Sequence, residues 1–188
     1  TGTLNLGKAI QEGEPSSLSA TVEGWFYVEK WVEGAVLFEQ KENDSNLFGI
    51  YLGNLEKKQL IVKADGWQME CDNVLGPEQW QHLAVTMDPT SSRNPMRIYV
   101  NNQNLKGTID KPADGVMYTL KDIDADAVVG TGFIGKMDEL MVWRNARTTF
   151  TSDMDGTLTS AVFPGGGYDA IFFDGYWKFD REDNIGYN

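Results

Sequence analysis

Apolar and polar residues alternate with a period of two along most of this chain, as they do in β-strands that bury one face. The alternation is clearest over residues 18–28. One face of that segment would carry Leu18, Ala20, Val22, Gly24, Phe26 and Val28. The other face would carry Ser19, Thr21, Glu23, Trp25 and Tyr27. This pattern predicts a half-buried strand with two aromatic side chains on its second face.

Other segments with the composition of strands lie at 34–40, 46–53, 57–64, 80–87, 96–109, 116–120, 126–130, 136–144 and 170–180. Residues 96–109 predict a hairpin that turns at Asn101 and Asn102, because asparagine tolerates positive φ. The alternation breaks within 137–143, which indicates a β-bulge. The one helix candidate, at 149–157, is short. Roughly a dozen short strands between turn residues predict an all-β fold, a two-sheet antiparallel β-sandwich or jelly roll.

The domain organisation follows from length and from the last strand. A chain of 188 residues suits one domain. We expect a single sandwich over 1–188, in which the strand at 170–180 completes a sheet and residues 181–188 form a polar tail.

Four segments resemble motifs of the laminin G-like domains in the concanavalin A-like lectin and glucanase superfamily. They are TVEGWFYV at 21–28, WQHLAVT at 80–86, RIYVNN at 97–102 and FIGKMDELMVWRNAR at 133–147. The four occur in the family's order and at similar distances. The resemblance implies a concanavalin A-like jelly roll.

Two features depart from the family pattern. Asn102 stands where a turn glycine is usual, and a YWKFD segment at 176–180 resembles a strand that usually opens these domains. The C-terminal strand therefore either fills that sheet position or opens a further module. The resemblance also implies a module of a larger secreted or surface-anchored bacterial protein, outside the cell, with the secretion signal not in this chain.

The charge and the cysteine count exclude several classes of partner. A formal net charge of −12 opposes binding to nucleic acid and to an anionic membrane surface. No run of 18 apolar residues is present, so we expect no insertion into a membrane. Cys71 is the one cysteine, so no internal disulfide can form, and its alternating surroundings predict a core position.

The sequence lacks the carboxylate spacing of the superfamily's glucanases. Retaining enzymes of that kind place two carboxylates about 5.5 Å apart, which an E-x-D-x-E strand achieves. Asp138 and Glu139 are adjacent and would face opposite sides of a strand. His82 matches a scaffold histidine of the family motif. We therefore expect no enzymatic activity and keep a glycoside hydrolase as the remote alternative.

Calcium is the one cofactor that the resemblance suggests, at the rim of the sandwich. Calcium prefers oxygen ligands, and Asp122, Asp124 and Asp126 would share one side of an extended segment. The competing interpretation is a solvated acidic loop. Both stay open from the residues alone.

A glycan or polysaccharide is the expected partner, and a surface protein is the alternative. Sugars stack on exposed aromatic rings, whereas Trp25, Phe26, Trp80 and Trp143 fall in scaffold motifs and are expected in the core. The candidates for a binding surface lie beside turns or on a polar strand face: Trp31, Trp67, Tyr168 and Tyr51. The expected function is thus a non-catalytic carbohydrate-binding module, with a protein-binding, adhesive or structural spacer module as the alternative.

Overall fold

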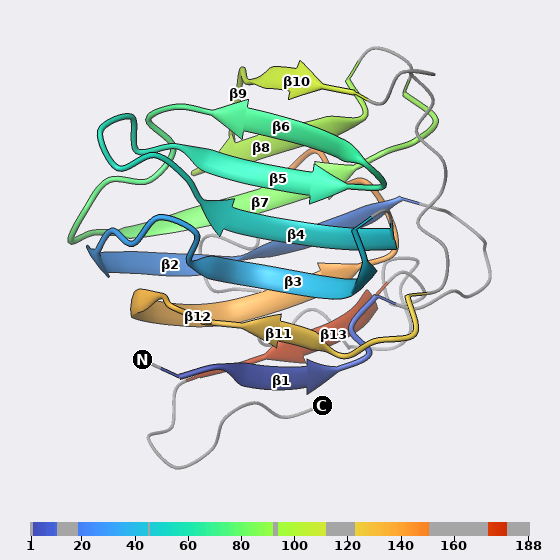
Figure 1. Cartoon of the computed structure of the whole chain (residues 1–188), viewed down its shortest axis with the longest axis horizontal. Coiled ribbons are helices and arrows are strands. Elements are labelled where there is room, and N and C mark those ends of the chain that lie inside the picture. Colours follow the sequence, from blue (N-terminus) through green and yellow to red (C-terminus); the bar gives the residue numbers. More distant parts are fainter. Residues whose placement is uncertain are drawn as a thin grey trace.

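A computed structural model describes residues 2–10, 19–44, 46–91, 94–111, 123–150 and 173–179 of the chain. All regular structure in these ranges is β-strand, and the strands form two antiparallel sheets that pack face to face (Figure 1). The described ranges hold no helix of the length and apolarity needed to cross a membrane. The predicted all-β sandwich is confirmed.

The seven strands of sheet A lie at the front of Figure 1. In spatial order they are β1 (Leu4–Gly7), β11 (Ala127–Val129), β3 (Val36–Asn43), β4 (Asn46–Leu52), β5 (Leu60–Ala64), β6 (Trp67–Cys71) and β10 (Thr108–Asp110). The six strands of sheet B lie behind it. In spatial order they are β13 (Phe173–Trp177), β12 (Ile134–Trp143), β2 (Ala20–Lys30), β7 (Trp80–Met87), β8 (Met96–Val100) and β9 (Gln103–Leu105).

The core lies between the facing surfaces of the two sheets. In sheet A the register places Phe38 beside Ile50 and Ile50 beside Val62, and all three side chains are buried. Sheet B contributes Val22 and Leu83 from its inner face, as the alternation along each strand predicts. Burial of each such side chain stabilises the fold by about 1.5–3 kcal/mol. Because side chains alternate between the two faces of a strand, the apolar face of each strand is the one that faces the other sheet.

Several local predictions are confirmed. The β8–β9 hairpin turns at Asn101 and Asn102, whose φ angles are 48° and 62°. The register of β12 against β2 shifts between Asp138 and Met141, at the expected bulge. Cys71 is buried in the core.

The C-terminal strand pairs with β12 at the edge of sheet B, so Tyr176 and Trp177 of the YWKFD segment contribute to this sandwich. Strand β1 was not expected and forms the opposite edge of sheet A, beside β11. The predicted strand at 116–120, most of the predicted helix (151–157) and the predicted tail at 181–188 lie outside the described residues.

A second buried region covers part of the outer face of sheet B. Residues 144–150 follow β12 and fold back over this face. The Thr21 hydroxyl donates to the Asn145 carbonyl oxygen at 2.5 Å and accepts from the Arg147 N–H at 3.0 Å. Phe150 packs on Tyr99, with ring centroids 5.0 Å apart. Thr21 and Glu23, on the outer face of β2, are therefore buried as well as the side chains on its inner face.

The charged centre of this second buried region is Glu23, whose side chain is fully buried. One carboxylate oxygen accepts a hydrogen bond from Arg147, and the other lies 3.2 Å from His82 Nε2. The Arg147 guanidinium also lies 4.2 Å from the centroid of the Trp143 ring. A buried carboxylate tolerates desolvation only when a cation compensates its charge, so Arg147 secures residues 144–150 to the sheet.

We expect Arg147→Met to lower the free energy of unfolding by about 3 kcal/mol, because it leaves a buried carboxylate without its cation. Chemical denaturation of Arg147→Met, Glu23→Met and the double variant measures the coupling. The double variant should lose less than the sum of the two single losses. Arg97→Met is the matched control, since Arg97 bonds only the partly exposed Ser91 hydroxyl in the described structure. Strict additivity of the two losses would contradict the assigned role.

Candidate functional site

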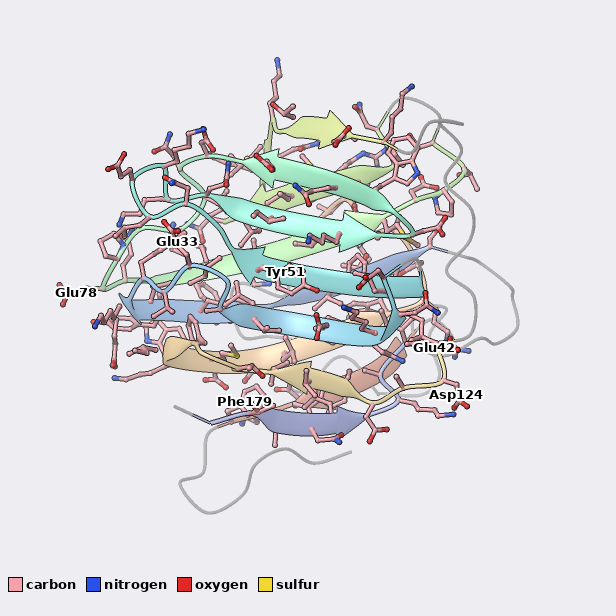
Figure 2. All side chains as sticks on the ribbon, in the orientation of Figure 1. Glu33, Glu42, Tyr51, Glu78, Asp124 and Phe179 are labelled. Atoms are coloured by element: carbon pink, nitrogen blue, oxygen red, sulfur yellow. The ribbon has the colours of Figure 1, made fainter. Side chains whose placement is uncertain are left out.

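A hollow of about 320 Å³ opens on the outer face of sheet A, at the end where the β2–β3 and β4–β5 connections meet. Its wall comprises Glu33, Gly34, Tyr51, Leu52, Gly53, Asn54, Ile61 and Lys63. Figure 2 shows Tyr51 on the outward side of β4 and Glu33 in the turn at the same end of the sheet. We call this hollow the Tyr51 corner.

Short hydrogen bonds fix the two connections that border the Tyr51 corner. The Gly34 N–H donates to the Leu52 carbonyl at 2.7 Å, with Gly34 at a φ of 80° that favours glycine. The Trp31 indole N–H donates to the Gly53 carbonyl at 2.9 Å. The Glu33 carboxylate accepts from the Leu55 N–H at 2.8 Å. The wall of the corner is thereby held by bonds between the two loops.

The Tyr51 ring lies across Gly49, on the outer surface of the sheet. A Cβ atom at position 49 would overlap the Tyr51 phenol, so only glycine leaves room for this placement. The Tyr51 hydroxyl donates to a Glu39 carboxylate oxygen at 2.6 Å, and Lys63 Nζ lies 5.8 Å from the ring centroid. The ring is therefore anchored at its hydroxyl end and borders the hollow.

Burial raises the pKa of the Tyr51 phenol far above its usual value. The hydrogen bond to Glu39 and the negative charges of Glu39 and Asp44 raise this pKa further. The phenol therefore stays protonated, as a hydrogen-bond donor, throughout the neutral range.

The structure brings two of the four predicted aromatic residues to this corner. Tyr51 borders the hollow, and Trp31 bonds to its wall through Gly53 and lies under Lys58, whose Nζ is 5.3 Å from the ring centroid. Tyr168 lies outside the described residues.

The expectation that Trp67 is exposed was wrong. Trp67 is buried, because it is on the same face of β6 as Met69 and Cys71, and that face points into the core. The charged and polar residues that precede Trp67 in the sequence lie in the turn and do not surround its side chain. Trp67 thus contributes to packing and not to an exposed surface.

Among the residues expected in the core, Trp80 was also placed wrongly. Its side chain is 43% exposed, because it begins β7 on the outer face of sheet B. Trp25 is half-buried, whereas Phe26 and Trp143 are buried as expected.

The polar groups of the Tyr51 corner, Glu33, Asn54 and Lys63, were not predicted from the sequence. The spacing of Gly49 and Tyr51 on one strand face was the available indication.

The acidic segment lies at the other end of the sandwich from the Tyr51 corner, where Figure 2 labels Asp124. Asp124 pairs with the Lys8 ammonium, and the hydrogen bond and charge of that lysine lower the pKa of Asp124. Asp126 accepts from the Asn5 amide at 2.9 Å, and Asp122 lies outside the described residues. In the described part of the chain no three His, Cys, Asp or Glu side chains gather as for a metal ion. Calcium binding remains a prediction.

The two adjacent acids of β12 make local contacts. Asp138 accepts from the Glu139 N–H at 2.9 Å, and Glu139, at a φ of 52° in the bulge, accepts a hydrogen bond from the Tyr176 hydroxyl. The bulge thus engages Asp138 within β12 and Glu139 with β13.

The chain belongs to the concanavalin A-like lectin/glucanases superfamily, whose family model matches residues 8–149. The resemblance seen in the four sequence motifs is thereby confirmed. No curated protein matches the chain significantly.

Solved structures with this fold include carbohydrate-binding proteins. A protein from Bacteroides ovatus ATCC 8483, provisionally assigned as carbohydrate-binding, is 19% identical with a TM-score of 0.63, and the match covers 100% of this chain and 52% of that one. Our chain therefore spans about half of that protein's length. At this identity the likeness shows the fold.

Two further neighbours are parts of enzymes that act on glycans. Domain 4 of an extracellular arabinanase from Geobacillus stearothermophilus, solved with arabinotriose, is 16% identical with a TM-score of 0.57, over 77% of this chain and 67% of that one. A module of a Ruminococcus gnavus sialidase, solved with α2,3-sialyllactose, is 11% identical with a TM-score of 0.51, over 78% of this chain and 91% of that one.

We expect Tyr51 to ionise at a higher pH than an ordinary tyrosine, which titrates near pH 10. Since its folded pKa is raised, its contribution to stability is complete below about pH 10 and is lost as the pH rises through the folded value. The absorbance difference between wild type and Tyr51→Phe during alkaline titration measures the pKa of Tyr51. Glu39→Gln should lower this pKa, and Glu42→Gln on the same strand is the control. A Tyr51 that titrates normally would contradict the described contact.

Proposed function

We propose that this domain is a non-catalytic carbohydrate-binding module and that the Tyr51 corner contacts the sugar. The observation that carries the proposal is the Tyr51 ring, which lies across Gly49 beside a hollow with polar and apolar walls. An aromatic ring offers a sugar its apolar face, and nearby polar groups orient the hydroxyls.

The dimensions and chemistry of the Tyr51 corner suit a short stretch of a glycan. Its volume of about 320 Å³ falls at the lower end of ligand sites, which hold about 300–1,000 Å³. Glu33 and Asn54 supply acceptors and Lys63 a donor within one wall, together with the apolar surface of Ile61. This mixture matches a ligand that alternates C–H faces with hydroxyl groups.

The structural neighbours support the same class of ligand. Two of them were solved with an oligosaccharide, and each is a part of a larger glycan-processing enzyme. By analogy, this domain would hold a larger extracellular or surface-anchored bacterial protein near its polysaccharide. The analogy is one of fold, so the Tyr51 corner carries the argument for the site.

The proposal that the module is non-catalytic is supported by the disposition of its carboxylates. Asp138 bonds the adjacent Glu139 N–H, Glu139 accepts from Tyr176 of β13, and the buried Glu23 pairs with Arg147. Glycoside hydrolysis requires two carboxylates that face one bond from opposite sides.

Calorimetric titration with a panel of soluble oligosaccharides tests the proposal. The panel contains arabinotriose, α2,3-sialyllactose and hexasaccharide fragments of cellulose, xylan and mannan. We expect one or more to bind, and we expect Tyr51→Ala to weaken binding by about tenfold, since truncating an anchoring aromatic costs about 1–2 kcal/mol. Tyr51→Phe keeps the ring and should retain most of the affinity.

The thermal midpoint of each variant separates loss of binding from loss of folding. Leu55→Ala is the matched control, because Leu55 is an exposed apolar side chain that does not border the hollow. Equal affinities of wild type and Tyr51→Ala for the sugar would show that the sugar does not bind at the Tyr51 corner. Lack of binding across the panel would favour the alternative of a protein-binding or spacer module.

Repeating the titrations with calcium and with a chelator tests the predicted cofactor. We expect binding at the Tyr51 corner to survive chelation, because Glu33 is its one carboxylate wall residue. Loss of binding in chelator would place the sugar at the acidic rim instead. Asp124→Ala and Asp126→Ala would then be the variants to measure.

A further inference from the structure

The outer face of sheet B is covered over only part of its area. Glu23 and Ala84, which are register partners in β2 and β7, are fully buried; Glu23 pairs with Arg147, and Ala84 clusters with Tyr99 and Phe150. Two positions further along the same face, the register pairs Trp25 with His82, and Trp25 is half-buried. Two more positions along, Tyr27 pairs with Trp80, which is 43% exposed. The covering segment thus leaves one end of the face open.

Trp80 is the one exposed tryptophan of the six in the chain. The other large apolar side chain that is comparably exposed in the described structure is Leu55, on a loop of sheet A. An exposed apolar patch is more informative than a single exposed residue, so the neighbours of Trp80 decide its meaning.

The open end of the face is an aromatic surface one row of side chains wide. Three neighbouring strands place Lys136, Tyr27 and Trp80 side by side. The Tyr27 and Trp80 ring centroids are 5.7 Å apart, with the rings tilted by 56°. Lys136 Nζ lies 5.2 Å from the centroid of the Tyr27 ring and 3.8 Å from a Glu29 carboxylate oxygen. We call Tyr27, Trp80 and Lys136 the Trp80 platform.

The row behind the Trp80 platform makes it rigid. Trp25 packs edge-on against His82, with ring centroids 5.5 Å apart, and His82 lies against the fully buried Glu23. The platform rings therefore stand beside the second buried region and not on a loop. A preorganised surface loses little conformational entropy when a ligand binds.

The size and charge of the platform decide what it can bind. A stable protein–protein interface buries about 800 Å² on each partner, far more than two rings supply. A second copy of this chain would bring a further net charge of −12. Lys136 of the platform and the neighbouring Glu29 lie close enough to pair, so neither favours a charged ligand. A neutral molecule with a flat apolar face and hydroxyl groups at its edge fits best.

We propose that the Trp80 platform is a second carbohydrate contact, which takes a neutral pyranose stacked on Trp80. Lys136 and Glu29 stand where they can bond the hydroxyls of that sugar or of its neighbour. The platform is on sheet B and the Tyr51 corner is on the outer face of sheet A, so the two sites have no residue in common. The proposal shares with the proposed function only the class of ligand, and each site can fail alone.

The indole N–H resonances of ¹⁵N-labelled protein distinguish the two sites. The chain has six such groups, and Trp31→Phe and Trp80→Phe each assign one of them by its loss. The Trp31 N–H bonds the wall of the Tyr51 corner and reports on that site. The Trp80 N–H reports on the platform. The neutral hexasaccharides of the panel are the probes.

We expect one or more of the hexasaccharides to shift the Trp80 resonance in a saturable titration. Tyr27→Leu should weaken that titration by roughly fivefold or more while keeping an apolar side chain. Leu55→Ala, which removes a comparably exposed apolar group elsewhere, should leave it unchanged. A thermal midpoint near that of wild type confirms that Tyr27→Leu is folded.

The outcomes separate the two proposals. A shift at Trp80 with none at Trp31 supports the platform and counts against the Tyr51 corner. A shift at Trp31 with none at Trp80, across every hexasaccharide, overturns the platform and leaves the proposed function standing. A shift at Trp80 that Tyr27→Leu does not weaken also overturns the platform as described, since its rings would not act together.

Discussion

The ion pair between Glu23 and Arg147 determines how this sandwich uses its second sheet. A carboxylate on the outer face of a strand would ordinarily point to water, and the sequence pattern alone predicts that for Glu23. Because Arg147 compensates its charge, the face can be covered by residues 144–150, and Thr21, Phe150 and Tyr99 become core residues. The extent of that cover decides which aromatic rings of β2 and β7 are buried and which reach solvent.

Most of the fold follows from period-two patterning. The strands around the core were predictable because each buries alternate residues, and the β8–β9 turn because Asn101 and Asn102 accept positive φ. Strand β1 was not predictable, since its four residues are too few to show alternation and it pairs only at the edge with β11. Short edge strands are stabilised by their neighbours more than by their own sequence.

The candidate site was predictable in part. Tyr51 was found because it is on the polar face of its strand, and Trp31 because it adjoins a turn. Trp67 and Trp80 were misjudged for the same reason: whether a ring is buried depends on which face of the strand meets the other sheet and on what covers that face. Neither of these two determinants can be inferred from the residues that flank the tryptophan in the sequence. The covering segment is more than 60 positions away from Trp80 in the chain, and no local pattern reveals it.

The two ends of the described chain meet at one side of the molecule. Gly2 and Phe179 border the same hollow, and β1 and β13, which lead into and out of the sandwich, are the outermost strands of sheets A and B (Figure 1). Tension applied through the two ends would therefore peel β1 from β11 and β13 from β12 before it reached any other strand. The strands that carry Tyr51 and Trp80 are each bonded on both sides. Such tension would thus act first on the edge strands, while the faces that carry Tyr51 and Trp80 kept their shape.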